Sequence, residues 1–117
     1  MTNLIVITIV LLTVAESDGH GNRVGDHGKA IGILQMHKEM VDEVNRLFKT
    51  KYTYSDRADP WRSVEMAQLY LTWAAKEYSI VSPVQLAYRW NKPRHGKVSA
   101  TYRRRIVKAM HHMYGVR

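Results

Sequence analysis

The chain has 117 residues and a formal net charge of +8, and it contains no cysteine. This length fits one domain with a real hydrophobic core, and the lack of cysteine excludes disulfides and thiolate metal sites, so packing must supply the stability. The basic excess lies wholly in residues 61–117, which carry a net charge of +9 against −1 for residues 1–60, and such a surface either attracts polyanions (anionic cell wall, nucleic acid or acidic membrane) or serves only solubility.

An apolar run of eleven residues, Leu4–Val14, lies near the start of the chain and is broken only by two threonines. It has the length of a signal-peptide core and is too short to span a bilayer. No basic side chain precedes it, so the pattern is not a convincing signal peptide, and the route of export stays open. We predict instead a helix that is buried on all sides in the middle of the domain, although its many β-branched residues would equally suit a strand.

The spacing of apolar side chains by three and four residues predicts a second helix from Ile33 to Phe48. The segment that follows, Lys49 to Asp59, is polar and aromatic without a period. It leads into Asp59-Pro60, a pair typical of a helix start, because the aspartate accepts free amide hydrogens and proline lacks the amide that would stay unpaired. A third helix should therefore begin at Pro60 and continue to about Tyr78.

Serine residues predict the starts of two further helices. The sequence Ser82-Pro83-Val84-Gln85 has the form of a capping box and predicts a short helix to about Trp90. After a basic loop over Asn91–Val98, a last helix should follow Ser99 and end at Gly115. No internal repeat and no convincing strand alternation are present elsewhere, so the domain is predicted to be mainly α.

A glutamate and a glycine-rich segment follow the first predicted helix. Glu16 follows the apolar run after one alanine, and five glycines fall within residues 19–32. Glycine at this density lets the backbone turn tightly and approach a ligand, as in the floor of a cleft. Desolvation at the end of an apolar helix raises the pKa of a carboxyl group, which is what a general acid near neutral pH requires. Glu16 is therefore the candidate catalytic acid.

Four short motifs in this order resemble one enzyme superfamily. They are Glu16-Ser17, Gly28-x-x-x-Gly32-x-x-Gln35 within GDHGKAIGILQ, Tyr70-Leu71 and Trp90-Asn91. Their order and spacing are similar to the goose-type lysozyme and soluble lytic transglycosylase (SLT) superfamily over about residues 3–110. The resemblance implies one lysozyme-like domain, residues 1–117, of about five helices around a buried N-terminal catalytic helix. It implies a secreted, periplasmic or phage-associated enzyme, such as a phage lysin, that cleaves the β-1,4 bond between N-acetylmuramic acid and N-acetylglucosamine in peptidoglycan without a cofactor.

The same resemblance assigns roles to individual residues of the front half. Glu16 would protonate the glycosidic oxygen, and Ser17 would support it. Gln35 and the backbone around Ile33 would line the sugar cleft. Tyr70, in a later helix, would orient the acid or the acetamido group of the sugar.

The Trp90-Asn91 pair would form the opposite wall of the cleft. Asn91 would bind sugar there. Trp90 stands where the family often has tyrosine, and its ring would either stack on a pyranose face or fill the core. After Asn91, family members often have Gly-Gly-Pro, whereas this chain has Lys92-Pro93-Arg94-His95-Gly96, which would reshape that end of the cleft.

A second carboxylate distinguishes two mechanisms that the resemblance allows. Goose-type lysozymes place an aspartate two residues after the glutamine, where this chain has His37. Asp26 matches a second aspartate of those lysozymes, and an inverting hydrolase would need it as a base about 6.5–9.5 Å from the acid. With a single carboxylate, Glu16 serves as acid and then as base while the sugar's own 6-hydroxyl closes a 1,6-anhydro ring. We favour this lytic transglycosylase route.

Other functions are weighed against the glycan enzyme. The six histidines have no zinc spacing and no calcium loop is complete, so no metal is expected. A nucleic-acid-binding module could use the basic C-terminal half with Tyr88, Trp90 and Tyr102 as stacking groups, but it would leave Glu16 and the glycine-rich segment unexplained. A lysozyme-like wall binder without activity would fit the altered loop after Asn91. We favour a monomeric enzyme that binds glycan strands and presents its basic face to anionic wall polymers.

Overall fold

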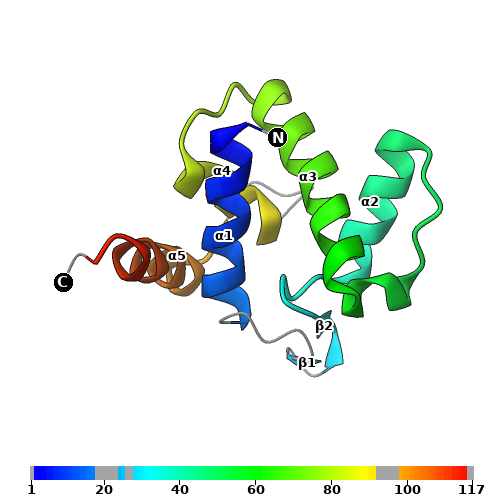
Figure 1. Cartoon of the computed structure of the whole chain (residues 1–117), viewed down its shortest axis with the longest axis horizontal. Helices are drawn as coiled ribbons and strands as arrows, with labels where there is room; N and C mark the ends of the chain where they lie inside the picture. The colour runs from blue at the N-terminus through cyan, green and yellow to red at the C-terminus, as the bar shows by residue number, and fades with distance from the viewer. Residues whose placement is uncertain (1, 18–23, 26–27, 92–97, 116–117) are drawn as a thin grey trace.

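The N-terminal helix is the centre of a mainly helical fold (Figure 1). The structure, a computed structural model, describes residues 2–17, 24–25, 28–91 and 98–115. Helix α1 contacts α3, α4 and α5, so the predicted mainly α fold of five helices around the N-terminal helix is confirmed for the described part of the chain. The elements in chain order are α1 (Asn3–Ser17), β1 (Val24–Gly25), β2 (Ala30–Ile31), α2 (Lys38–Phe48), the 3-10 helix η2 (Tyr54–Ala58), α3 (Pro60–Glu77), α4 (Pro83–Asn91) and α5 (Ala100–Met113).

Tertiary contacts determine the conformation of α1, because its β-branched sequence would also suit a strand. Thr8 and Thr13 satisfy their hydroxyl groups within the helix by donating to the carbonyl oxygens four residues earlier, at 2.7 and 2.9 Å. The helix can therefore enter the core without an unpaired threonine. Its buried apolar residues are Ile5, Ile9, Leu11 and Leu12.

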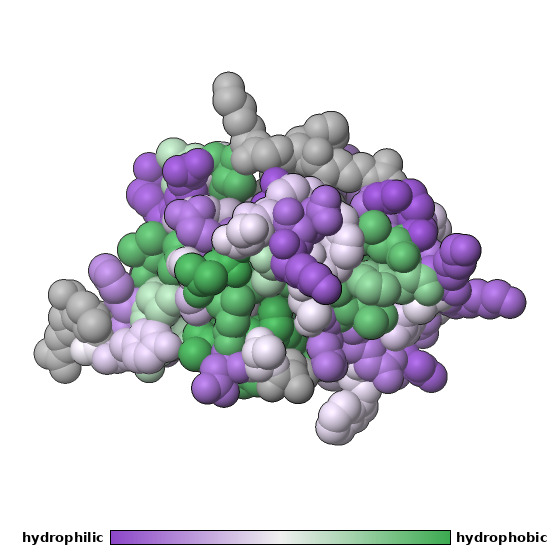
Figure 2. Space-filling model, turned by 90° about the horizontal axis from the view of Figure 1, so that it is seen from above, coloured by the Kyte–Doolittle hydropathy of each residue, from purple (hydrophilic) through white to green (hydrophobic). Residues whose placement is uncertain are grey.

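Helix α1 is not buried on all sides, contrary to the prediction from the sequence. Val6 and Val10 are 43% and 46% exposed. Figure 2 shows the molecule from above the view of Figure 1, and on this face green apolar surface lies between purple polar regions. Val81, in the connection between α3 and α4, is a further exposed apolar residue. The neighbouring helices thus cover only part of the circumference of α1.

Predicted N-caps begin α3 and α5. The Asp59 carboxylate accepts hydrogen bonds from two amides in the first turn of α3, at 2.9 and 3.3 Å, and Pro60 is the first residue of that helix. At the start of α5, Ser99 Oγ accepts a hydrogen bond from the Tyr102 amide at 3.1 Å. Such caps satisfy amides that have no partner within the helix, which is why the predicted and observed starts agree.

The second helix begins later than predicted, at Lys38 instead of Ile33. Gln35 has a left-handed backbone with φ of 46°, and backbone hydrogen bonds of 3.0 and 3.2 Å pair Ile31 with Met36 across a tight turn. The spacing of Ile33 and Met36 fits a helical period, but here both lie in or next to this turn. The apolar pattern therefore gave the wrong start.

One hydrophobic core cluster joins residues from α1, α2, α3, α4 and α5. The Cα radius of gyration is 13.2 Å, close to the value of about 13 Å for a compact chain of roughly this length. In the part of the chain that the structure describes, no helix is both long and apolar enough to cross a membrane.

Candidate active site

Glu16 lies in the last turn of α1, at the end of the helix nearer to the β1–β2 hairpin (Figure 1). The residue is half-buried, and its Oε1 atom is buried without a hydrogen-bond partner among the described residues. Removal from water disfavours the charged carboxylate and raises the pKa of Glu16 from 4.5 to about 7. A hydrogen bond with Tyr102 and the charge of Arg105 oppose this rise without cancelling it. Glu16 thus keeps its proton up to about neutral pH, as a general acid must.

Tyr102, in the first turn of α5, is the side chain that the structure brings to Glu16. It is buried, and the loss of solvent together with the neighbouring Glu16 carboxyl raises the pKa of its hydroxyl well above the usual value. The hydroxyl therefore remains protonated. It donates to the Ala87 carbonyl oxygen over a long distance of 3.5 Å, and it lies close enough to Glu16 to lower the pKa of that carboxyl group. Arg105 has its Cζ atom 5.9 Å from the centre of the Tyr102 ring, so its charge lies near the same pair. The sequence suggested Tyr102 as a stacking group for nucleic acid, and no local pattern shows that it meets Glu16.

Ser17 connects the end of α1 to the turn after β2. It is fully buried, and its Oγ donates to the Ile33 carbonyl oxygen over 2.5 Å, with the Thr13 carbonyl oxygen farther away at 3.4 Å. A hydroxyl group has one hydrogen, so the closer carbonyl is its main acceptor. Because Ser17 directly follows Glu16, this contact fixes the carboxyl group relative to the turn. The predicted supporting role of Ser17 therefore has a physical basis.

The Gln35 side chain holds the same turn from within. Its Nε2 donates to the Gly32 carbonyl oxygen at 2.9 Å. Its Oε1 lies so near Gly25 that a Cβ atom added there would come within 2.5 Å of it. Gln35 thus links the turn to β1 and gives the loop beside Ser17 its shape.

A family comparison agrees with this arrangement of a glutamate-serine pair and a glycine-glutamine turn. The profile of the family described as Transglycosylase SLT domain matches residues 3–109. The chain belongs to this family. The predicted resemblance to soluble lytic transglycosylases is therefore confirmed over nearly the whole chain, and membership implies peptidoglycan lytic transglycosylase activity. Comparison with curated proteins and with solved structures returned no significant match.

Beneath the turn of this SLT domain lies Arg57 of η2, which is 5% exposed. Its Nη1 donates to the carbonyl oxygens of Lys29 and Met36, at 3.0 and 3.1 Å, and its Nε donates to that of Tyr54 at 2.7 Å. The turn packs closely in return, because a Cβ atom on Gly32 would lie 2.1 Å from the Arg57 carbonyl oxygen. Burial lowers the pKa of the guanidinium, but arginine stays charged. The sequence did not reveal this residue, because a single arginine in an aperiodic segment carries no local signal.

Tyr70 of α3 lies in the core of the SLT domain. It is fully buried, and its hydroxyl group forms a hydrogen bond with Arg89 of α4. Burial raises the pKa of Tyr70 to about 12. The predicted role of Tyr70, to orient the acid or the acetamido group of the sugar, stays a prediction. The tyrosine hydroxyl that acts on the pKa of Glu16 is that of Tyr102 of α5.

Trp90 of α4 also fills the core. It is 5% exposed, its Nε1 donates to the Leu34 carbonyl oxygen at 3.0 Å, and its ring meets the Tyr70 ring at a centroid distance of 6.2 Å. Of the two roles predicted for Trp90, core filling is the one that the structure supports, because so buried a ring has no free face for a pyranose. The bond to Leu34 instead ties α4 to the turn that holds Gln35.

Two predicted site positions are not placed by the structure. Asp26 lies outside the described residues, as does the loop of residues 92–96. Asn91 ends α4, but its side chain also lies outside the described part. Among the residues that are described, no group of three or more histidine, aspartate or glutamate side chains could hold a metal ion.

Proposed function

We propose that this chain cleaves the β-1,4 bond between N-acetylmuramic acid and N-acetylglucosamine by lytic transglycosylation, with Glu16 as the acid. The observation that carries this proposal is the partly dehydrated carboxyl group of Glu16, whose pKa of about 7 keeps it protonated where an ordinary glutamate is charged. Membership of the SLT family supplies the substrate class, peptidoglycan.

A single carboxyl group is sufficient for both proton transfers. Glu16 first gives its proton to the glycosidic oxygen, and the bond from that oxygen to C1 of N-acetylmuramic acid breaks. The C6 hydroxyl of the same sugar then bonds to C1 and returns its proton to Glu16. The strand ends in a 1,6-anhydro ring, no water is consumed, and Glu16 is protonated for the next cycle.

The described surroundings of Glu16 suit an acid that later acts as a base. Its pKa is lowered through a hydrogen bond by Tyr102 and through a charge by Arg105, which offset part of the rise caused by burial. Ser17 positions the acid through Ile33. The glycan would then run along the turn that Gln35 shapes, with Asn91 binding sugar from α4. A hydrolase that used Asp26 to direct water would share this groove and differ in its product.

Mass spectrometry of digested peptidoglycan tests the proposal. The purified protein should release 1,6-anhydro muropeptides, which are lighter by one water than hydrolysed ones. Glu16→Gln keeps the shape of the side chain and removes the acid, so it should release neither product. Reducing-end products would instead show a hydrolase, and intact peptidoglycan would show a wall binder without activity. Either outcome contradicts the proposal.

Tyr102→Phe is expected to raise the pKa of Glu16 further, because the lost hydroxyl stabilises the charged carboxylate. The alkaline limb of the pH–rate profile should then move to higher pH, since Glu16 stays protonated for longer. Tyr88→Phe, which alters a half-buried tyrosine of α4, is the matched control. A limb that stays in place in Tyr102→Phe would contradict the assigned contact, and an NMR titration of the glutamate side chains measures the same shift without turnover.

A hollow on the outer face of α5 is lined by three of the eleven lysine and arginine side chains of residues 61–117. We propose that this basic hollow attracts anionic wall polymers and so holds the enzyme near its substrate, because clustered positive charge raises the local concentration of polyanions. All of the side chains that line it are exposed. They belong to Arg103, Arg104, Val107, Lys108 and His111.

Reversing two charges in the basic hollow should weaken binding to isolated cell walls. Arg104→Glu combined with Lys108→Glu is expected to reduce binding at low salt by about tenfold or more. The difference in affinity between this double variant and the unaltered protein should shrink as salt screens the charges. Lys51→Glu combined with Lys76→Glu makes the same change in net charge at two exposed lysines outside α5 and is the control. Binding to cell walls is measured by co-sedimentation at two ionic strengths. Equal losses of binding in the two double variants would contradict a local binding site on α5.

A further inference from the structure

Trp61, in the first turn of α3, has 82% of its surface exposed. The other two tryptophans contribute to the core, since Trp73 is half-buried and Trp90 is almost fully buried. Tryptophan is a highly buried residue on average, and an indole ring in water gains nothing for the fold. Exposed tryptophans are common where a surface binds a partner, because the ring offers a large contact area.

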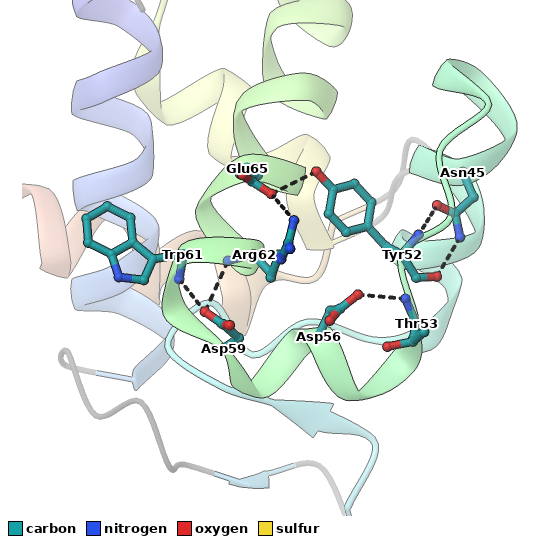
Figure 3. A network of polar contacts seen from close by, with 8 residues as sticks. All are labelled: Asn45, Tyr52, Thr53, Asp56, Asp59, Trp61, Arg62 and Glu65. Atoms are coloured by element: carbon teal, nitrogen blue, oxygen red, sulfur yellow. Dashed lines mark hydrogen bonds and ion pairs between the residues drawn. The ribbon is translucent and has the colours of Figure 1, made fainter.

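The backbone that carries Trp61 is held in place by a network of polar contacts (Figure 3). Asp59 accepts hydrogen bonds from the Trp61 and Arg62 amides. Arg62 donates to Glu65 at 3.2 Å, and Glu65 also accepts a hydrogen bond from the Tyr52 hydroxyl at 3.1 Å. The backbone of Trp61 is therefore held in place, so only the torsions of the side chain remain to be fixed when a ligand binds to the ring.

A short series of contacts connects this position to the catalytic glutamate. Glu16 is followed by Ser17, whose Oγ is bound to the Ile33 carbonyl. The neighbouring Gly32 packs against the carbonyl of Arg57, which lies three residues before the first residue of α3. Figure 3 shows the Trp61 ring pointing away from the polar network and toward the side of α3 on which α1 lies.

We infer that Trp61 is a sugar-binding platform, on which an N-acetylated pyranose ring of the glycan strand stacks beyond the two sugars joined by the cleaved bond; this inference rests on the proposed function. The faces of a β-1,4-linked pyranose carry C–H groups, and an exposed indole ring offers a flat apolar surface of matching size. With only two side-chain torsions to fix, tryptophan supplies this area at low conformational cost. A strand bound at both Glu16 and Trp61 would be held more tightly than one bound at Glu16 alone.

A binding experiment without turnover tests the platform. Glu16→Gln protein is titrated with oligomers of β-1,4-linked N-acetylglucosamine, and calorimetry gives the Kd. Adding Trp61→Ala should weaken binding of long oligomers by about tenfold, and Trp61→Phe should recover part of the loss because it keeps a flat ring. Tyr114→Ala removes another exposed aromatic side chain, after the end of α5, and should leave the Kd unchanged. An unchanged Kd in Trp61→Ala overturns the inference.

Kinetics separate this inference from the proposed function. In the otherwise unaltered protein, Trp61→Ala should raise KM for long glycan strands about tenfold with a much smaller change in kcat. If Trp61→Ala weakens binding while Glu16→Gln still releases products, the proposed mechanism is wrong and the sugar platform stands. If Glu16→Gln is inactive while Trp61→Ala binds and cleaves long strands as well as the unaltered protein, the platform alone is wrong.

Discussion

Glu16→Gln is expected to abolish glycan cleavage and, above about pH 8, to make the folded protein more stable. The activity is lost because glutamine has no proton to give to the glycosidic oxygen. The stability rises because the unaltered protein must keep a charged carboxylate partly buried at this pH, with Oε1 unpaired among the described residues. Loss of function with gain of stability is the behaviour expected of a residue kept for chemistry and not for folding.

The size and sign of the stability change follow from the pKa of Glu16. Folding raises this pKa from 4.5 to about 7. Between these values the unfolded chain releases its proton while the folded chain keeps it, so the free energy of unfolding falls as pH rises. The loss reaches about 3 kcal/mol above pH 7, since each pKa unit corresponds to about 1.4 kcal/mol. Below about pH 4 both states are protonated, and the variant and the unaltered protein should be equally stable.

Urea unfolding at about pH 4 and pH 8 measures this difference. Glu77→Gln, which removes an exposed carboxylate at the end of α3, is the matched control and should show no comparable change. A stability difference for Glu16→Gln that is the same at both pH values would mean that Glu16 is well solvated. The acid role proposed for it would then lose its physical basis.

Features that depend on neighbouring residues in the chain could be predicted from the sequence. Asp59 with Pro60, and Ser99 with the amide of Tyr102, are complete caps within a few residues, so the starts of α3 and α5 were correct. The raised pKa of Glu16 was also accessible, because the apolar helix before it already indicated an environment with little water. The family motifs added the likeness to SLT domains, which the profile match confirms.

Contacts between distant parts of the chain could not be predicted in this way. The approach of Tyr102 to Glu16 joins the first and last helices, and the hydrogen bonds of Arg57 join η2 to both sides of the turn after β2. Trp90 was expected either to stack on a pyranose face or to fill the core, because an aromatic ring at this motif position suits both roles, and burial distinguishes them only in three dimensions. The start of α2 was missed because backbone turns and helices can share an apolar spacing.

Gly32→Ala is expected to destabilise the fold far more than Gly28→Ala. Both glycines have φ of +86°, so alanine meets the same left-handed strain at either position, which costs about 1 kcal/mol. At Gly28 the added methyl group meets none of the described residues within 4 Å, whereas at Gly32 it would lie 2.1 Å from the carbonyl oxygen of Arg57. Since backbone cannot move aside as a flexible side chain can, we expect a total loss of about 3 to 5 kcal/mol for Gly32→Ala.

The same pair of variants tests how the turn positions the acid. If the methyl group pushes residue 32 away from Arg57, the Ile33 carbonyl moves with it, and Ser17 loses its acceptor or draws the end of α1 along. A displacement of about 1 Å at a reacting group can lower the rate by roughly a hundredfold, so Gly32→Ala should lose activity even at temperatures where it is folded. Gly28→Ala should keep most of its activity.

Urea unfolding measures the loss of stability in each variant. Wall-clearing rates, measured below the melting temperature of both variants, show the separate effect of a displaced Glu16 on activity. Equal destabilisation by Gly28→Ala and Gly32→Ala would mean that the Arg57 carbonyl gives way easily. If Gly32→Ala does not fold at all, Arg57→Lys offers a milder test, because lysine keeps the charge but cannot reproduce the fork that binds Lys29, Met36 and Tyr54. A lysine variant with full activity and full stability would show that the turn beside Glu16 holds its shape without this support.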